Sequence, residues 1–358
     1  MRRRGSGQAR GCAALAAAWL ASAAFAQTGG IYDKPFIRTG GAGTAVGGYM
    51  DLELALTEAR KTFDQRRFVP FIHGEVSDRI HVLAEIEFEH GGHVKGGGGG
   101  DGEIKLEFAV LDIRFAESLG LRGGVILSPL GRFNLQHDSP LNDLTSRPLV
   151  DQQVIPTTLS ESGLGLFGTL YPTQSGVLSY EAYLVNGFGG AAATSLRSGR
   201  GSQSVDNNEE KSVVARVGYS PWLGLETGAS VHRGAYDDAG EENLTIWALD
   251  GSYILGPLEV RGELARATVD GAPAGTRSGY YAQAGYHLLP GLLPRFPDSI
   301  LTATARYDFI DLDTSEETRY TFGLNARPRE ETAIKLDYEV YDQDDDSNGF
   351  LLSLASYF

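Results

Sequence analysis

Apolar and polar residues alternate along most of the chain from Gly48 onward. The stretch 79–90 shows the pattern, with Ile80, Val82, Ala84, Ile86 and Phe88 at one set of positions and His81, Leu83, Glu85, Glu87 and Glu89 at the other. A helix would scatter these residues around its circumference, whereas a β-strand separates them onto two faces. The chain is therefore predicted to consist mainly of two-faced strands.

Sixteen segments carry this alternation. They lie at 49–56, 66–74, 79–90, 103–115, 119–127, 162–171, 177–188, 211–219, 223–235, 243–254, 257–269, 278–289, 299–311, 317–326, 331–341 and 348–358. The pattern is weakest between Leu244 and Tyr253.

The connections between these segments alternate in length. Short turns at 76–78, 116–118, 172–176, 220–222 and 255–256 alternate with longer loops at 91–102, 128–161, 189–210, 236–242, 270–277 and 342–347. The proline-rich connection 290–298 is too long for the short side. Short turns on one side and long loops on the other are typical of an antiparallel barrel in a bacterial outer membrane.

The first 26 residues have the form of a cleaved secretory signal peptide. Four arginines precede an apolar run from Cys12 to Ala24, and Ala24-Phe25-Ala26 matches a cleavage site. The run is too short for a membrane anchor, which needs about 20 residues. Residues 27–48 are then a flexible, Gly-rich lead-in, and 49–358 form the barrel.

Composition narrows the choice of class. The full chain has 47 Gly, 16 Tyr and 16 Phe, which suit sheets and turns better than helices. Its formal net charge is -15, and no excess of Lys or Arg is present to meet phosphate, so nucleic acid is not expected as a partner. The only Cys lies in the predicted signal peptide, so the mature chain can form no disulfide.

A soluble β-sandwich is the alternative to a membrane barrel, since it too would bury one apolar face of each strand. In a bilayer, the strands must close into a barrel because an open edge leaves amide groups unpaired in hydrocarbon. The last segment alternates up to a terminal aromatic residue, Phe358. Such an ending resembles the signal that the barrel-assembly machinery reads in outer-membrane proteins, and it favours the barrel.

The stretch 128–168 carries a more specific resemblance. Its segments 128–134, 141–150, 155–158 and 163–168 are similar to the phosphate-selective porin O/P family of bacterial outer-membrane porins. Segments 67–71 and 180–188 are similar to other strands of that family. The resemblance implies an all-β, transmembrane antiparallel barrel of about 16 strands, often a homotrimer, with a long inward-folding loop between strands 5 and 6.

By the strand count, that loop is 128–161, and its charged residues are candidates for a constriction: Arg132, His137, Asp138, Asp143, Arg147 and Asp151. The strands add lumen-lining candidates, which are Lys105, Arg216, Arg261, Arg306, Lys335, Glu85, Glu87, Glu107, Glu263 and Asp337. With Glu161, the loop segment holds two Arg against four carboxylates, so we expect weak ion selectivity, within about 10-fold either way.

Three other patterns suggest chemistry without completing a site. Asp344, Asp346 and Asn348 partly fit a calcium loop, but position 355, where its bidentate Glu should stand, is Ala. His90 and His93 have no Cys or carboxylate in register for a metal. His137-Asp138-Ser139 contains triad residue types, but adjacent residues do not normally face one another as a triad. We therefore predict no cofactor, no metal site and no enzymatic activity.

The sequence thus predicts an outer-membrane porin, a water-filled channel for passive diffusion of small hydrophilic solutes or ions, including anions such as phosphate. Expected partners are outer-membrane lipid, lipopolysaccharide and two further copies of the chain, which associate through the first and last strands. The alternative is a closed structural or surface-binding barrel without channel activity.

Overall fold

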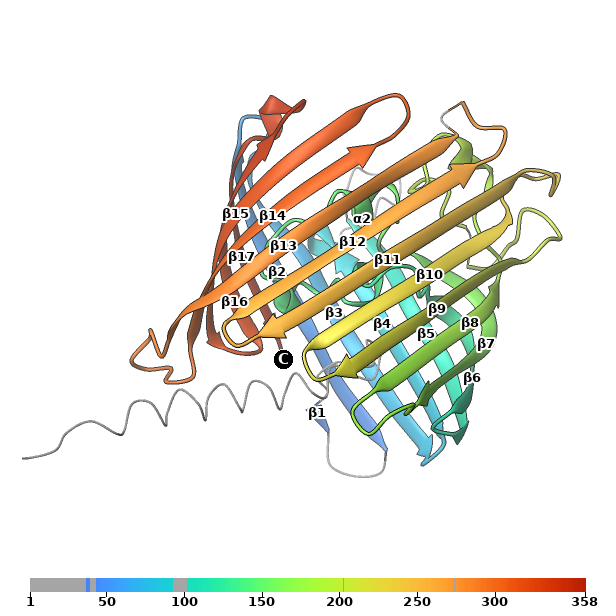
Figure 1. Cartoon of the computed structure of the whole chain (residues 1–358), viewed down its shortest axis with the longest axis horizontal. Helices are drawn as coiled ribbons and strands as arrows, with labels where there is room; N and C mark the ends of the chain where they lie inside the picture. Colours follow the sequence, from blue (N-terminus) through green and yellow to red (C-terminus); the bar gives the residue numbers. More distant parts are fainter. Residues whose placement is uncertain (1–36, 39–42, 93–101, 202, 274) are drawn as a thin grey trace, which may run out of the picture.

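The computed structural model describes residues 37–38, 43–92, 102–201, 203–273 and 275–358. The predicted signal peptide, most of the predicted lead-in and His93 lie outside these residues. Among the residues described, no helix is long and apolar enough to cross a membrane. Strands dominate the described chain (Figure 1).

The strands are β1 (Ile37–Arg38), β2 (Thr44–Thr57), β3 (Lys61–Ser77), β4 (Ile80–Glu89), β5 (Glu103–Ala116), β6 (Leu119–Leu127), β7 (Ser160–Leu170), β8 (Val177–Val185), β9 (Ser212–Trp222), β10 (Leu225–Ala235), β11 (Asn243–Leu255), β12 (Leu258–Val269), β13 (Thr276–Pro290), β14 (Ile300–Asp311), β15 (Glu316–Arg329), β16 (Thr332–Tyr341) and β17 (Gly349–Tyr357). The short helices are η2 (His90–Gly92), η3 (Phe133–Leu135), η4 (Ser139–Leu141), α2 (Val150–Gln153), η5 (Gly190–Ala193) and η6 (Asp345–Ser347).

Strands β2 to β17 form one closed antiparallel barrel of sixteen strands. Each strand pairs with its neighbour in the chain, and β17 pairs back onto β2 with Leu352 opposite Leu54. The two-residue β1 pairs with β2, with Ile37 opposite Val46, beyond the point where β17 ends. The predicted fold class and strand number are confirmed.

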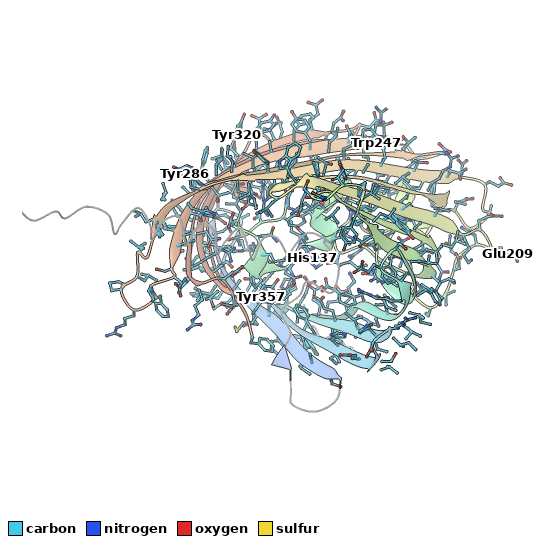
Figure 2. All side chains as sticks on the ribbon, turned by 60° about the horizontal axis from the view of Figure 1, so that its bottom comes forward. His137, Glu209, Trp247, Tyr286, Tyr320 and Tyr357 are labelled. Carbon is cyan, nitrogen blue, oxygen red and sulfur yellow. The ribbon has the colours of Figure 1, made fainter. Side chains whose placement is uncertain are left out.

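The two faces of the strands separate as the alternation predicted. In β16, Lys335 and Asp337 are buried inside the barrel, whereas Ile334, Leu336 and Tyr338 are 39%, 45% and 39% exposed on the outside. The same separation is visible in Figure 2, where Trp247, Tyr286 and Tyr320 lie on the outer wall and His137 lies in the interior. The outer face suits hydrocarbon, and the inner face carries the charges.

Most strand limits lie within three residues of the prediction, and β2 and β3 are the exceptions. These two strands pair beyond a bulge at Asp51–Glu53 and end in a hairpin at Leu56 and Lys61. The prediction placed this end of β3 at residue 66. Alternation marks only the part of a strand that lies between lipid and lumen, while pairing continues past it.

The Gly-rich lead-in predicted for 27–48 also ends early, because β2 begins at Thr44. Gly48 lies inside the strand, where a Cβ atom would meet the ring of Phe358 at 2.6 Å. The backbones of Gly48 and Phe358 exchange hydrogen bonds of 2.9 and 3.2 Å. This glycine therefore lets the terminal aromatic residue close against the first barrel strand.

Two classes of connection separate at the two ends of the barrel. One end has the turns 78–79, 117–118, 171–176, 223–224, 256–257, 291–299 and 330–331. The other end has 58–60, 90–102, 128–159, 186–211, 236–242, 270–275, 312–315 and 342–348. We call them the turn end and the loop end. The connection 291–299 lies at the turn end, although it is long, as the sequence predicted for 290–298.

Candidate functional site

The segment 128–159, called the inner loop below, lies against the inside wall of the barrel. Its helix α2 is enclosed by the strands in Figure 1. Apolar side chains of the inner loop form one buried cluster with loop 186–211 and with strands β11 to β14. The cluster includes Leu130, Leu149, Val150, Val154, Ile155 and Leu159 from the loop, Phe188, Ala192 and Leu196 from 186–211, and Leu244, Ile246, Ala248, Ala265, Ala267, Val269, Tyr281 and Ile310 from the wall.

This cluster explains why the alternation was weak between Leu244 and Tyr253. The inward residues Leu244, Ile246 and Ala248 of β11 face the inner loop rather than water. Both faces of that part of β11 are therefore apolar, one toward lipid and one toward the loop. An apolar anchor of this kind fixes the loop to one side of the lumen.

Wall cations predicted to line the lumen bind backbone carbonyls of the inner loop. Arg306 donates to the carbonyl of Ser146 at 2.9 Å, and Lys335 donates to the carbonyl of Ser139 at 2.6 Å. Arg319, which the prediction did not name, donates to the carbonyl of Arg147 at 2.6 Å. These three cations therefore hold the inner loop against the wall.

Wall carboxylates bind backbone N–H groups of the same loop. Asp337 accepts a hydrogen bond from the N–H of Thr145 at 2.6 Å. Glu263 accepts from the N–H groups of Arg132 and Phe133 at 2.8 and 3.1 Å. Gly131 has φ +70, and a Cβ atom there would lie 2.0 Å from Glu263. Only glycine allows the loop to turn this closely around the carboxylate.

The acidic constriction candidates face the wall. Asp138 accepts a hydrogen bond from the hydroxyl of Tyr357 at 2.9 Å. Asp143 accepts from Asn325 at 2.9 Å and Arg327 at 3.4 Å, and the charge of Arg327 is the largest influence that lowers the pKa of Asp143, against the opposing effect of burial. None of these groups contributes a free negative charge to an opening.

Asp151 and His137 are buried in the same way. Asp151 is fully buried in α2. His137 lies 2.7 Å from Glu107 through Nε2 and 2.9 Å from the carbonyl of Asn134 through Nδ1. Ser139, its neighbour in the triad-like run, donates instead to Asp51 at 2.5 Å. The three side chains of that run therefore have separate partners.

The two arginines of the inner loop differ from each other. Arg132 forms an ion pair with Glu226. Arg147 donates one hydrogen bond, to the carbonyl of Thr157 at 2.7 Å, while its Nε and Nη2 atoms are buried without an acceptor among the described residues. Burial, and then the charge of Arg67, lowers the pKa of the Arg147 guanidinium to about 10. Arg147 thus carries a positive charge that no carboxylate in hydrogen-bond contact neutralises.

Three further cations converge beside Arg147. Arg197 donates to the same Thr157 carbonyl at 2.8 Å, and Lys105 and Arg200 each donate to the carbonyl of Thr158 at 2.9 Å. Four cationic side chains therefore share two neighbouring carbonyl oxygens. Carbonyl groups offset only part of this charge, so positive charge is concentrated at this point of the inner loop.

The remaining lumen-lining candidates form ion pairs along the wall. Arg216 binds Asp250 through two hydrogen bonds of 2.6 and 2.8 Å. Arg261 pairs with Glu259 and lies 4.0 Å from Asp143. Glu87 accepts from Arg67 at 2.8 Å. Glu85 is fully buried on the same inner face.

A cavity of about 550 Å³ opens beside the inner loop near the loop end, and we call it the outer vestibule. Six arginines and two glutamates line it: Arg60, Arg66, Arg67, Arg147, Arg197, Arg319, Glu53 and Glu339. The sequence prediction named only Arg147 of this set as a site residue. Arg67 and Arg319 occupy inward positions of their strands, so strand alternation could have identified them. Arg197 lies in the long loop 186–211, where no such alternation exists.

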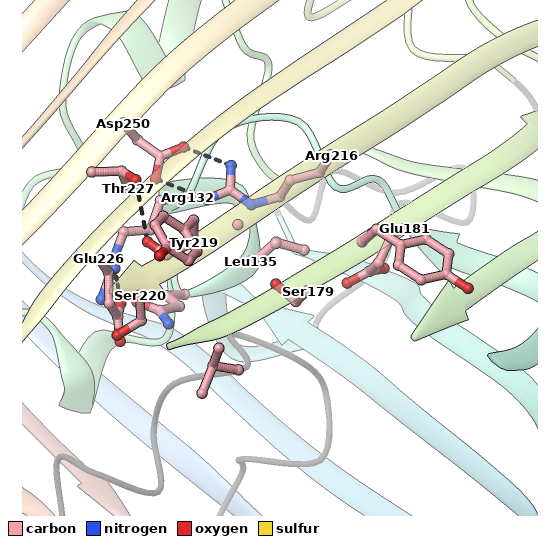
Figure 3. Close-up of a pocket in the computed structure, with 14 residues that line it drawn as sticks. Arg132, Leu135, Ser179, Glu181, Arg216, Tyr219, Ser220, Glu226, Thr227 and Asp250 are labelled. Carbon is pink, nitrogen blue, oxygen red and sulfur yellow. Dashed lines mark hydrogen bonds and ion pairs between the residues drawn. The ribbon is translucent and has the colours of Figure 1, made fainter. Parts of the chain in front are cut away.

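A second, small cavity lies near the turn between β9 and β10, and we call it the inner pocket (Figure 3). Its charged lining is more balanced, with Arg132 and Arg216 against Glu181, Glu226 and Asp250. Figure 3 shows Arg216 directed at Asp250, consistent with their paired hydrogen bonds. The unbalanced positive charge is therefore at the outer vestibule.

Comparison with known proteins identifies the family. The model of the Gram-negative porin family matches residues 11–354. The chain belongs to the Gram-negative porins. It is therefore an outer-membrane protein that forms a channel for passive diffusion. The narrower resemblance to phosphate-selective porins is not part of this assignment.

Individual relatives of this porin are distant in sequence. An uncharacterized protein of Aquifex aeolicus is 26% identical over 343 residues, which cover 85% of this chain and 77% of that protein. An anion-selective porin from Comamonas acidovorans has a TM-score of 0.59 at 11% identity, over 88% of this chain and 99% of that one. OmpT of Vibrio cholerae, in a trimer form, has a TM-score of 0.56 at 13% identity, over 89% and 100%.

Within the described residues, no group of three or more His, Cys, Asp or Glu side chains is arranged to hold a metal ion. In the calcium-like run, Asn348 instead accepts a hydrogen bond from the N–H of Tyr341, and Asp344 accepts one from Ser347. His90 contacts Asp64 at 2.9 Å. These contacts cap the strand ends at the loop end of the porin.

Proposed function

We propose that this porin conducts small anionic solutes in preference to cations. The observation that carries the proposal is the lining of the outer vestibule. Its Arg66, Arg67 and Arg319 form ion pairs with carboxylates. Its Arg60, Arg147 and Arg197 have no ion-pair partner among the described residues and leave the lining with unneutralised positive charge. Charges that line a narrow passage with low-dielectric walls act more strongly than charges on outer loops. The total charge of the chain, which is negative, therefore does not decide which ions enter.

The contacts of the loop acids explain why the charge count in the sequence, two Arg against four carboxylates, predicted only weak selectivity. Asp138 and Asp143 are bound by wall residues, and Asp151 is buried. The count gave each of them the same weight as Arg147. Because Arg147 borders the vestibule and these acids do not, the local charge is positive.

Reversal potentials test the proposal. In a potassium chloride gradient across a planar bilayer, the wild-type channel should pass chloride more readily than potassium. Arg147→Gln should lower the permeability ratio roughly five-fold, equivalent to about 1 kcal/mol. Arg266→Gln is the matched control, because Arg266 is exposed on the outward face of β12.

A wild-type channel that passes both ions equally, or favours potassium, would contradict the proposal. Complete absence of conductance in correctly folded protein would favour the alternative of a closed structural or surface-binding barrel. Replacing chloride by phosphate in the same recording tests the resemblance to phosphate-selective porins. A channel that prefers phosphate should still carry current after the replacement.

We also propose that the mature porin begins after residue 26, that it has no catalytic activity, and that it assembles as a homotrimer in contact with lipopolysaccharide. The exposed ring of Phe358, stacked on Phe68 at 5.6 Å on the outside of the barrel, supports its recognition by the barrel-assembly machinery. The apolar outer faces of β2 and β17 support the trimer, because Leu56, Phe350 and Leu354 are 49%, 49% and 45% exposed there.

A further inference from the structure

Asp151 lies on the side of α2 that packs against the wall strands β12, β13 and β14. It is fully buried, and neither oxygen of its side chain receives a hydrogen bond from the described residues. The Oε1 atom of Glu263 on β12 is also buried and receives no hydrogen bond from the described residues. The two carboxyl groups nevertheless lie within hydrogen-bonding reach of each other.

The charges around this pair do not supply a cation for it. Glu263 accepts two backbone N–H groups of the inner loop through its other oxygen, Oε2. Arg306 and Arg319 both bind Asp308 on β14, which also accepts the N–H of Leu149 at 3.1 Å.

The other two wall strands present no free cation either. From β11, Asp250 faces Glu263 but is bound by Arg216. From β13, the phenol of Tyr281 is buried beside both acids. Burial, followed by the charges of Glu263 and Asp308, raises the pKa of Asp151 well above its usual range.

If both carboxyl groups were ionised, the two negative charges within hydrogen-bonding reach would repel each other, and neither group could donate a hydrogen bond. A single retained proton removes the repulsion and supplies the one donor that the pair lacks. Glu263 is the better anion of the two, because backbone N–H groups already stabilise its charge. Asp151, which receives no hydrogen bond that would stabilise its anion, is the weaker acid and keeps the proton.

We propose that Asp151 is a positioning residue, protonated at neutral pH, whose hydroxyl donates a hydrogen bond to Oε1 of Glu263 and so fastens the inner loop to the wall. Asp151 keeps this proton only while the inner loop is docked against the wall. Attachment is therefore complete where Asp151 is protonated and weakens as the pH rises through the folded-state pKa, since a raised pKa in an acid means that docking retains a proton. The loop should loosen in alkaline solution, not in acid.

Infrared spectroscopy of the whole protein in lipid tests the protonation state. The wild type should show the carbonyl stretch of a protonated carboxylic acid at neutral pH, and ¹³C-labelled aspartate should shift it. Asp151→Asn should abolish that band. Asp138→Asn should retain it, because Asp138 is an acceptor of the Tyr357 hydroxyl. A missing band in the wild type, as a pair bridged by a bound cation would give, overturns the proposal.

Channel recordings over a pH series test the positioning role. The wild type should become noisier and change conductance as the pH rises above neutral. In Asp151→Asn, the amide replaces the hydroxyl as donor, so the loop should stay docked and the alkaline change should disappear. Asp151→Ala lacks any donor and should be noisy at every pH. A pH profile unchanged in Asp151→Asn would overturn the assignment.

This inference rests on the proposed function only in its use of conductance as a readout. The infrared band does not depend on which ions pass, so loss of anion preference and loss of the shared proton are distinguishable results.

Discussion

Charged side chains inside the barrel fall into two groups according to what they bind. Lys335 and Arg306 bind loop carbonyls, and Arg216 and Glu87 form ion pairs along the wall. These contacts use the charge to hold structure. Arg147 belongs to the second group, because part of its guanidinium has no acceptor among the described residues. A charged side chain acts on solutes only when contacts within the protein do not neutralise it.

The sequence identified most wall charges but could not assign them to these groups. Alternation along a strand indicates which face a residue occupies, and that was sufficient to place Lys335 and Asp337 inside. Alternation does not indicate whether the partner is water, another side chain or a loop carbonyl. The partners of Asp138 and Asp143 lie on strands more than 180 residues away along the chain.

Asp308 provides a test of a structural charge. It accepts hydrogen bonds from Arg306 at 2.9 Å and Arg319 at 3.1 Å and from the N–H of Leu149. Asp308→Asn leaves two buried guanidinium groups without their counter-charge, so we expect the free energy of unfolding to fall by about 3–5 kcal/mol. Urea unfolding in lipid vesicles measures it. Asp313→Asn, at an exposed loop residue, is the control and should change little. Equal effects of the two substitutions would show that the buried pairs are not decisive.

At the scale of elements, the inner loop behaves as a small core inside the barrel. Strand alternation was readable because lipid and lumen impose opposite preferences at every second residue. The loop lacks such a constraint. Val150, Val154 and Ile155 are apolar without a strand period, and only the folded barrel shows that β11 to β14 provide their partners.

Ile155 tests whether this core holds the loop. Its side chain is fully buried in the cluster, so Ile155→Ala should weaken docking by about 2–4 kcal/mol. The mature chain is predicted to contain no Cys, so Ser146→Cys would give a unique label position in the loop. Maleimide should label this cysteine faster when Ile155→Ala is also present. Leu141→Ala, at a residue 48% exposed, should not change the labelling rate. Equal rates in all three proteins would contradict a role of the core in docking.

At the scale of the whole molecule, the described barrel presents an apolar outer surface that must meet either lipid or another copy. The proposed trimer uses the surface around the seam of β17 and β2. We expect an unboiled gel sample to migrate at about three times the monomer mass and a boiled sample at the monomer mass.

Leu354→Arg should convert the trimer to monomers, because the subunit interface would bury a charge without a partner, at a cost of about 3–5 kcal/mol that the separated subunits avoid. Leu249→Arg, on the outer face of β11 away from the seam, is the matched control and should leave the trimer intact. Light scattering in mild detergent gives the mass of each species. A wild-type protein that is monomeric there would contradict the proposal.

The seam between β17 and β2 has a consequence for how the porin is made. The two strands that close the ring lie at opposite ends of the barrel sequence, so this pairing is the one with the longest sequence separation. Until β17 is available, β2 and β16 are unpaired edges that hydrocarbon cannot accommodate. Insertion and closure must therefore be late and nearly simultaneous. A chain that lacks only β17 has the residues for almost every strand pairing of the native barrel and still has no stable place in the membrane.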